Sequence, residues 1–254
     1  MNVGIISGYG LELFGHRQDS LLVETSYGAV SLMVEEIEHH RIFLLNRHGD
    51  PPVHPPHMIS YRANIEALAA SHVDYIIGIG AVGSLQNSIR PGELVVPDDF
   101  FDATHDRVCS FFDSERVHVD MSIPFCPVLR QDLIEVARDH DEAKLHDHGV
   151  YVTTEGPRLE TPVEIRFFST VGDIVGMTLV PEVILAKEKG ICYASLCVVC
   201  NMGAGMQKSL PVTEIKDIIE SKKPVLQAII ADCIRSRKSP GDCSCKSLIE
   251  DSLL

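Results

Sequence analysis

Three charged side chains, two glutamates and an arginine, lie in the six-residue turn 155–160. The β-branched and aromatic run 149–153 before it predicts a strand. After the turn, Thr161 is placed as an N-cap, Pro162 as the first helical residue and Glu164 as the carboxylate of a capping box. The sequence therefore predicts a strand-to-helix turn that brings its charges to a helix N-terminus. Part of a binding site is the favoured interpretation, and solvated loop charges are the alternative.

Other residues suited to ligand binding follow predicted strands. The apolar run 42–45 ends in Arg47, His48 and Gly49, and glycine-bearing loops follow three more runs, 3–6, 75–79 and 191–199. Glycine lets the backbone approach a phosphate closely. Because α/β folds bind ligands at the carboxyl ends of their strands, these segments together predict one small-molecule pocket that can hold an anion.

The cysteines and histidines do not predict a metal site. Cys197 and Cys200 lie in an apolar run, which favours buried thiols, and no second pair stands at a ligand spacing. His54 and His57 share the proline-rich loop 50–57 without a carboxylate or thiol at a suitable distance. The tail carries Cys243-Ser244-Cys245, where a disulfide would be strained. A redox or stability feature and ordinary tail thiols both remain open there.

Composition limits the classes of partner. The chain has 254 residues, 45% of them hydrophobic, and a formal net charge of −14. This charge argues against nucleic acid and against an anionic membrane surface. No apolar stretch is long enough to cross a bilayer, and no signal peptide is recognisable at the start. We expect a cytoplasmic protein without membrane or nucleic-acid partners.

Strand and helix patterns alternate along the chain, which predicts an α/β fold with a largely parallel sheet. One domain is expected over 1–235, followed by a loose polar tail over 236–254. Two early strands, 21–30 and 31–36, are expected around the turn 26–28, and 98–119 is expected to be a long loop. Helices are expected to start at Ser60 and to cover 127–138, 181–189 and 213–235.

Six motifs in order resemble the methylthioadenosine phosphorylase and trimeric purine nucleoside phosphorylase family, from Val3 to about Ile230. They are 4–11, 47–49, 61–64, 83–85, 155–158 and the run 177–188, which reads Met-Thr-x-x-Pro-Glu-x-x-x-Ala-Lys-Glu. The resemblance implies a single domain with a mixed, twisted central sheet surrounded by helices. It also implies a homotrimer, with pairing into hexamers left open, and phosphorolysis of purine ribonucleosides in purine salvage. Phosphate is then a co-substrate, and no cofactor or metal is implied.

The resemblance also assigns site residues. Phosphate binding is implied for Gly8, Tyr9, Arg47, His48, Gly80, Ala81 and Thr178. Substrate binding is implied for Met177, Leu159, Glu160, Asn201, Met202, Gly203 and Val212, and for His118 reaching over from a neighbouring subunit. His48 and Asn201 are the expected catalytic residues. Tyr9 and Gly80 depart from the family, which commonly has hydroxyl residues at these positions, so weaker phosphate binding is expected.

Glu160 and Asn201 indicate which purine base the substrate carries. An Asn amide can donate to N7 or O6 of a 6-oxopurine, while a Glu carboxylate accepts from N1–H. This pairing favours 5′-methylthioinosine, inosine or guanosine as substrate. A methylthioadenosine phosphorylase, a nucleoside hydrolase on the same fold and a nucleoside-binding protein without catalysis are the alternatives.

Overall fold

The computed structural model describes residues 1–8, 19–140, 142, 144–209, 211–237, 243–249 and 252. Its centre is an 11-stranded sheet whose main path runs β2-β3-β4-β1-β5-β10-β9-β7. The strands are β1 (Asn2–Ser7), β2 (Asp19–Thr25), β3 (Gly28–Ile37), β4 (His40–Asn46), β5 (Tyr75–Ser84), β6 (Leu94–Val95), β7 (Asp99–Ala103), β8 (Leu145–His146), β9 (Val150–Thr154), β10 (Ile174–Gly176) and β11 (Cys192–Met202). Among the described residues, six strand pairings are parallel and four antiparallel. The sheet is therefore mixed, with a parallel majority.

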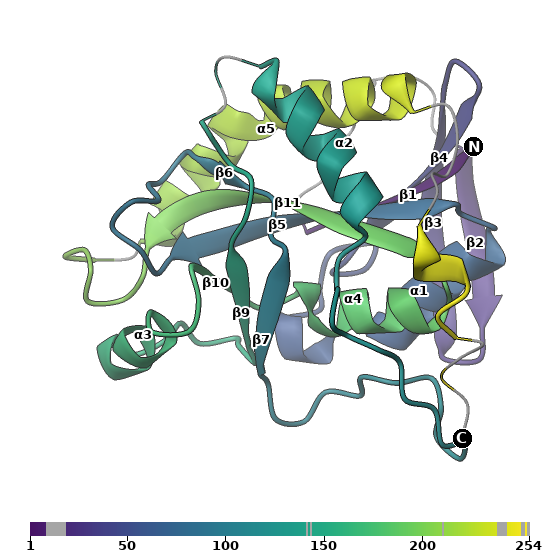
Figure 1. The fold of residues 1–254 in the computed structure, drawn as a ribbon, viewed down its shortest axis with the longest axis horizontal. Helices are drawn as coiled ribbons and strands as arrows, with labels where there is room; N and C mark the ends of the chain where they lie inside the picture. The colour runs from purple at the N-terminus through teal and green to yellow at the C-terminus, as the bar shows by residue number, and fades with distance from the viewer. Residues whose placement is uncertain are drawn as a thin grey trace.

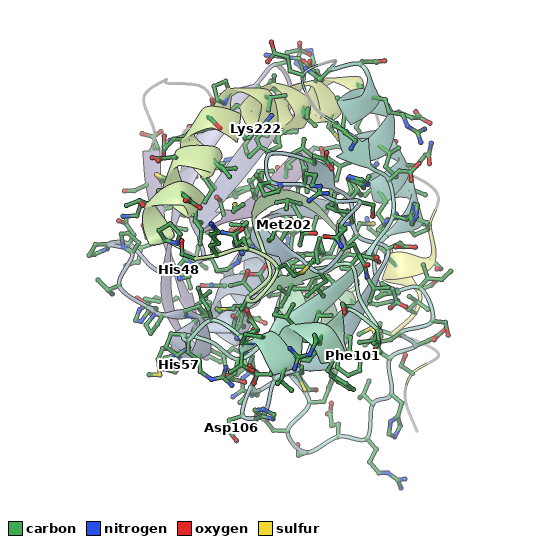
Figure 2. The ribbon with its side chains drawn as sticks, turned by 90° about the vertical axis from the view of Figure 1, so that its left-hand side faces the viewer. His48, His57, Phe101, Asp106, Met202 and Lys222 are labelled. Carbon is green, nitrogen blue, oxygen red and sulfur yellow. The ribbon has the colours of Figure 1, made fainter. Side chains whose placement is uncertain are left out.

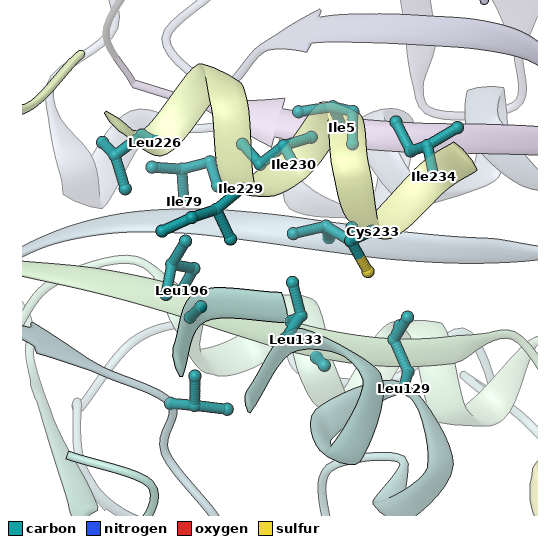
Figure 3. Packing of buried hydrophobic residues seen from close by; sticks show 14 of the residues in the cluster. Ile5, Ile79, Leu129, Leu133, Leu196, Leu226, Ile229, Ile230, Cys233 and Ile234 are labelled. Atoms are coloured by element: carbon teal, nitrogen blue, oxygen red, sulfur yellow. The ribbon is translucent and has the colours of Figure 1, made fainter. Parts of the chain in front are cut away.

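Helices cover both faces of this sheet (Figure 1). They are α1 (Tyr61–Ala70), α2 (Pro127–Arg138), α3 (Pro162–Phe168), α4 (Leu179–Glu188) and α5 (Val212–Ser236), with short 3₁₀ turns η1 (Pro56–Met58) and η2 (Ser244–Lys246). The helices α2 and α5 bury an apolar layer that includes Leu129, Leu133, Leu226 and Ile229 against β5 and β11 (Figure 3). On the opposite face, α1 and α4 pack over β1, β4 and β5.

The strand β5 is the central element of the sheet. It pairs with β1 and β10, and with β11 along its whole length. The sequence predicted that this strand ends at 79 and opens into a glycine loop, which is wrong, because it continues to Ser84. A Cβ on Gly80 would lie 3.0 Å from the Cys197 sulfur, and one on Gly83 would lie 3.1 Å from the Asn201 amide nitrogen. These glycines let β5 run close beneath the side chains of β11.

Two further glycines sit under tyrosine hydroxyls. A Cβ on Gly78 would come within 2.1 Å of the Tyr193 hydroxyl oxygen, and one on Gly176 within 2.2 Å of the Tyr151 hydroxyl oxygen. Both tyrosines are fully or almost fully buried. Each glycine is therefore required by a large side chain packed directly against its Cα.

Several predicted boundaries differ from the structure. The turn at 26–27 separates β2 from β3, so the two predicted strand ranges are wrong. The predicted arrangement of two strands around this turn is confirmed. Within the expected loop 98–119, β7 pairs in parallel with β9, because its polar pattern is that of an exposed edge strand. In the tail, Cys245 is 7% exposed and Ser252 is 6% exposed, so these residues are packed rather than loose. Among the described residues, no helix is long and apolar enough to cross a membrane.

Candidate active site

One pocket collects most of the chemistry-bearing residues. It has a cavity volume of about 190 Å³ and lies between the ends of β1, β4, β5, β10 and β11 and the turn before α3. The residues that line it and that the sequence analysis singled out are Gly8, Arg47, His48, Ala81, Leu159, Glu160, Met177, Thr178, Asn201 and Gly203. The sequence prediction of a shared pocket at the strand ends is confirmed.

At one end of the pocket, Arg47 is held by a buried carboxylate. Its Nε and Nη2 donate to the two oxygens of Glu182 at 2.5 and 3.0 Å, and its Nη1 donates to the Ile79 carbonyl at 2.9 Å. Glu182 is 0% exposed and also accepts from the Tyr193 hydroxyl at 2.9 Å. Burial alone would lower the pKa of Arg47, but the charge and hydrogen bonds of Glu182 raise it above its usual value. The guanidinium therefore stays charged and aligned along the pocket wall.

His48 stands beside Arg47 with its ring orientation fixed. Its Nδ1 lies 2.7 Å from the His54 carbonyl oxygen, which can only accept, so Nδ1 carries the proton and Nε2 is the acceptor in the neutral ring. A Cβ on Gly8 would lie 2.9 Å from Nε2, so the backbone of Gly8 covers that side of the ring. Burial lowers the pKa of His48 and Arg47 adds to this, although the His54 hydrogen bond opposes it. Since His48 lines the pocket, its neutral ring presents an acceptor there. Its side chain is labelled in Figure 2.

The segment with Met177 and Thr178 forms another wall and is tied down by an arginine that the sequence analysis missed. Arg107 donates to the carbonyls of Met177 and Val180, both at 2.6 Å, and to those of Thr154 and Glu155 at 3.2 and 2.8 Å. Its side chain is only 3% exposed. Arg107 therefore joins the end of β9 to the start of α4. It lies in an aperiodic stretch, and no local pattern marks it.

The other end of the pocket carries Glu160 and Asn201. The Thr154 hydroxyl donates to Glu160 Oε1 at 2.6 Å. Asn201 Nδ2 donates to the Met202 carbonyl at 2.8 Å, which leaves its second N–H and its amide oxygen for other partners. Asn201 pairs with Gly83 across the sheet, whereas Arg47 contacts Ile79, four residues earlier in β5. At about 3.3 Å per residue, the two ends lie about 13 Å apart along the strand.

The charged turn 155–160 contributes less to the pocket than expected. The capping box is confirmed, since Thr161 and Glu164 exchange both of its hydrogen bonds. Arg158, however, is exposed and pairs with Glu164, and Glu155 accepts from Arg107. Of the three charges in the turn, only Glu160 lines the pocket.

Some expected site residues lie elsewhere. Gly80 lies inside β5 and lines a small apolar cavity instead. The direction in which a side chain at this position would point is occupied by Cys197. Met202 is buried and does not line the pocket, and His118 is exposed, with its N–H donating to the Ser252 carbonyl at 2.9 Å. Tyr9 and the side chain of Val212 lie outside the described part of the structure.

A pocket with a fixed cation and a hydrogen-bonding polar pair, at the carboxyl ends of a mixed sheet, is typical of an enzyme that binds an anion beside a polar organic group. A family model described as the phosphorylase superfamily matches residues 2–235, and the chain belongs to this superfamily.

Individual proteins are similar over nearly the whole chain. A probable S-methyl-5′-thioinosine phosphorylase of Methanothermobacter thermautotrophicus is 43% identical over 252 residues, which cover 96% of this chain and 87% of that protein. A probable 6-oxopurine nucleoside phosphorylase of Dictyoglomus turgidum is 38% identical, with 99% and 97% covered. A methylthioadenosine phosphorylase from an antarctic soil metagenomic library superposes with a TM-score of 0.94 at 29% identity, with 99% and 92% covered.

Proposed function

We propose that this protein catalyses the phosphorolysis of 6-oxopurine ribonucleosides, with 5′-methylthioinosine as the leading substrate and inosine and guanosine beside it. The observation that carries the proposal is that one pocket is lined both by Arg47, His48 and Thr178, which suit an anion, and by Glu160 and Asn201, which suit a purine. The separation of about 13 Å along β5 suits phosphate at the first end and a purine at the second. The products are the free base and ribose 1-phosphate or its 5-methylthio derivative.

In the proposed reaction, a phosphate oxygen forms a bond to C1′ while the bond from C1′ to purine N9 breaks. The bonding electrons leave with the purine, and its N7 takes up a proton, which is balanced by the proton that monohydrogen phosphate loses as it becomes the sugar phosphate ester. No covalent enzyme intermediate, metal or cofactor is required. The protein contributes by holding the anion beneath C1′ and by stabilising the charge that develops on the base.

At the anion end, Arg47 supplies a permanent charge, because the charge and hydrogen bonds of Glu182 keep its pKa raised despite burial. Neutral His48 offers Nε2 as an acceptor for the proton of monohydrogen phosphate. The Thr178 side chain makes no hydrogen bond to cap α4, so its hydroxyl is available to a phosphate oxygen. These three contacts recognise an anion that still carries one proton.

At the base end, the side chains favour a 6-oxopurine. The free N–H of Asn201 can donate to N7 or O6, and the Glu160 carboxylate can accept from N1–H. Adenine has no proton on N1, so Glu160 would face another acceptor. The similar proteins described above include a probable thioinosine phosphorylase and a probable 6-oxopurine phosphorylase, which support this preference, and a methylthioadenosine phosphorylase, which represents the alternative.

We further propose a homotrimer in which His118 serves a neighbouring site, with hexamers left open. Within one chain His118 is exposed and does not line the pocket. Large apolar side chains are exposed near the pocket, which suits a subunit interface. They are Phe101, Leu159, Val163 and Phe167. We also propose a cytoplasmic location without nucleic-acid or membrane partners, and the net charge of −14 supports the absence of these two classes of partner.

The deciding assay measures base release from methylthioinosine, inosine and methylthioadenosine, with and without phosphate. We expect release from the two inosine compounds only when phosphate is present, with sugar 1-phosphate as product. Equal rates without phosphate, with free sugar, would identify a hydrolase. A preference for methylthioadenosine would identify the other branch of the family, and no release at all would favour a nucleoside-binding protein.

A further inference from the structure

Four cysteines from three distant parts of the chain converge at one point outside the active site. They are Cys126, Cys192, Cys243 and Cys245, and their sulfur atoms all lie within 4.8 Å of one another. The Sγ atoms of Cys192 and Cys243 are 3.2 Å apart. Among the described residues this is the only group of three or more metal-ligating side chains gathered in this way. The remaining four cysteines, Cys109, Cys197, Cys200 and Cys233, are not part of it.

Each of these cysteines is fixed by the element that carries it. Cys126 is the N-cap residue of α2, and its N–H donates to the Tyr193 carbonyl at 2.8 Å. Cys192 is the first residue of β11, Cys243 is the N-cap residue of the turn η2 and Cys245 lies within this turn. The η2 backbone packs on Gly190, whose φ of +66° belongs to the left-handed region. In Figure 1 the yellow η2 lies at the start of β11.

Positive charge lies beside the group. The N-terminus of α2, where Cys126 is the N-cap residue, places positive potential at the Cys126 sulfur. Lys187 is 5% exposed and interacts electrostatically with Cys126 and Cys245. Three of the four thiols are buried and that of Cys243 is half-buried. Thiols that only filled apolar space would need neither the cation nor the helix terminus.

We propose that Cys126, Cys192, Cys243 and Cys245 form a closed tetrahedral site for a zinc ion. Zinc bonds thiolate sulfur at about 2.3 Å in tetrahedral sites, which sets sulfur–sulfur edges of about 3.8 Å. That edge falls between the 3.2 Å pair and the 4.8 Å limit of the group. Zinc with four thiolates carries a charge of −2, and the Lys187 ammonium offsets half of it. All four ligands come from this chain, so no position is left for substrate and the site is structural.

The ion would bind the C-terminal segment to the body of the molecule. Cys126 lies at the C-terminal end of the loop that carries His118. The backbone N–H of His118 donates to the carbonyl of Ser252, which lies seven residues beyond Cys245. The zinc site therefore fixes both the loop and the segment that supports it. This proposal rests on the cysteine geometry alone and does not depend on the proposed reaction.

The test is the metal content of the full chain, purified in thiol reductant without chelator. We expect about one equivalent of zinc per chain by mass spectrometry of metals, as a closed four-thiolate site requires. Replacement of zinc by Co²⁺ should give the visible absorption of tetrahedral cobalt–thiolate coordination. The variant Cys243→Ser should lose the zinc and the cobalt spectrum, whereas the matched control Cys109→Ser, an exposed cysteine outside the group, should keep both.

Three results would overturn the site. The first is a wild-type chain without zinc that also takes up none from zinc-containing buffer. The second is retention of zinc at the wild-type level in Cys243→Ser. The third is an intact mass lowered by two hydrogens for each cysteine pair, since paired cysteines cannot supply four thiolates. The cobalt spectrum is read on the wild type, so the test does not depend on the folding of the variant.

Discussion

The two ends of the active-site pocket are built differently. At the anion end, Arg47 and Glu182 are almost completely buried, and the pair is completed by the Tyr193 hydroxyl and the Ile79 carbonyl. At the base end, Glu160 and Asn201 are partly exposed. The side chain of Glu160 accepts one hydrogen bond from Thr154, and that of Asn201 donates one to the Met202 carbonyl. At the first end, substitution of the buried Arg47 should therefore disturb the fold together with the chemistry. Substitutions at the second should change substrate preference while leaving the fold intact.

The largest effect is expected for Arg47→Ala. Removal of the guanidinium leaves Glu182 buried without its counter-charge, which costs about 3–5 kcal/mol of unfolding free energy. Urea unfolding measures this, and Arg158→Ala is the matched control, because its exposed pair with Glu164 contributes at most about 1 kcal/mol. An Arg47→Ala protein as stable as Arg158→Ala would break the contrast between the two ends.

His48→Ala tests chemistry at the same end. Loss of one preorganised contact to the reacting anion should lower kcat/KM by about 10²- to 10³-fold. The variant should unfold within about 1 kcal/mol of wild type, since His48 makes one neutral hydrogen bond to the backbone. Steady-state kinetics at saturating nucleoside and varied phosphate measure the loss. An unchanged phosphate dependence would remove His48 from the anion site.

The lowered pKa of His48 also sets a pH dependence. Its folded-state value lies below the ordinary 6.5, so the neutral ring is fully present above that pH. Its contribution to activity and to stability should be lost as pH falls through the folded value, and a rise above pH 7 should not remove it. The pH profile of kcat/KM for wild type and His48→Gln measures this, and the acid limb that belongs to His48 should be absent in the variant.

At the base end, Asn201→Asp combined with Glu160→Ser should move preference from 6-oxo- to 6-aminopurines. With adenine bound, the Glu160 carboxylate would face the unprotonated N1, and an acceptor left unpaired in the occupied pocket costs about 1–3 kcal/mol. This corresponds to a discrimination of about five- to two-hundredfold. Asn201→Asp alone should recover little activity on adenosine, because Glu160 remains. Ratios of kcat/KM for the inosine and adenosine substrates on all variants give the result. A single variant that switches as fully as the double one would show that Glu160 does not select the base.

The smallest effect is expected for Thr154→Val, which removes the hydroxyl that donates to Glu160. One hydrogen bond to a charged group contributes about 1.5–3 kcal/mol at most, and the partly exposed Glu160 should retain part of it through water. We expect a few-fold loss of kcat/KM for inosine, with the midpoint of urea unfolding nearly unchanged. A loss as large as that of His48→Ala would mean that Glu160 needs a fixed orientation for chemistry as well as for selection.

Local patterns in the sequence predicted local structure well. The capping box of Thr161 and Glu164, the helix 127–138 and the glycine-opened segment around Arg47 all depend on residues close in the chain, and the structure has them. The resemblance to a nucleoside phosphorylase family supplied the mixed sheet, which the residue patterns alone described as largely parallel.

Contacts between distant segments were beyond local patterns. Arg107 binds carbonyls more than forty residues away, and Glu182 holds Arg47 from 135 positions further along the chain. The same limit explains the cysteines. Cys126 and Cys192 reach the tail pair only through folding, so spacing along the chain did not reveal the group. The continuation of β5 through Gly80 was missed because glycine usually marks a turn, whereas here it makes room for Cys197.

The close contact between Gly78 and the Tyr193 side chain limits the order in which substitutions at these two positions can accumulate. An alanine at position 78 would meet the tyrosine hydroxyl at 2.1 Å, so that change cannot come first. Loss of the hydroxyl in Tyr193→Phe removes one of the donors to Glu182 and still leaves the ring carbon Cζ 2.8 Å from that methyl position. An alanine at position 78 can therefore follow only after a side chain smaller than phenylalanine has replaced Tyr193. Gly176 and Tyr151, whose Cζ would lie 2.8 Å from a Cβ at 176, impose the same order beside Thr178, so the order of substitutions is constrained at two separate places in the sheet.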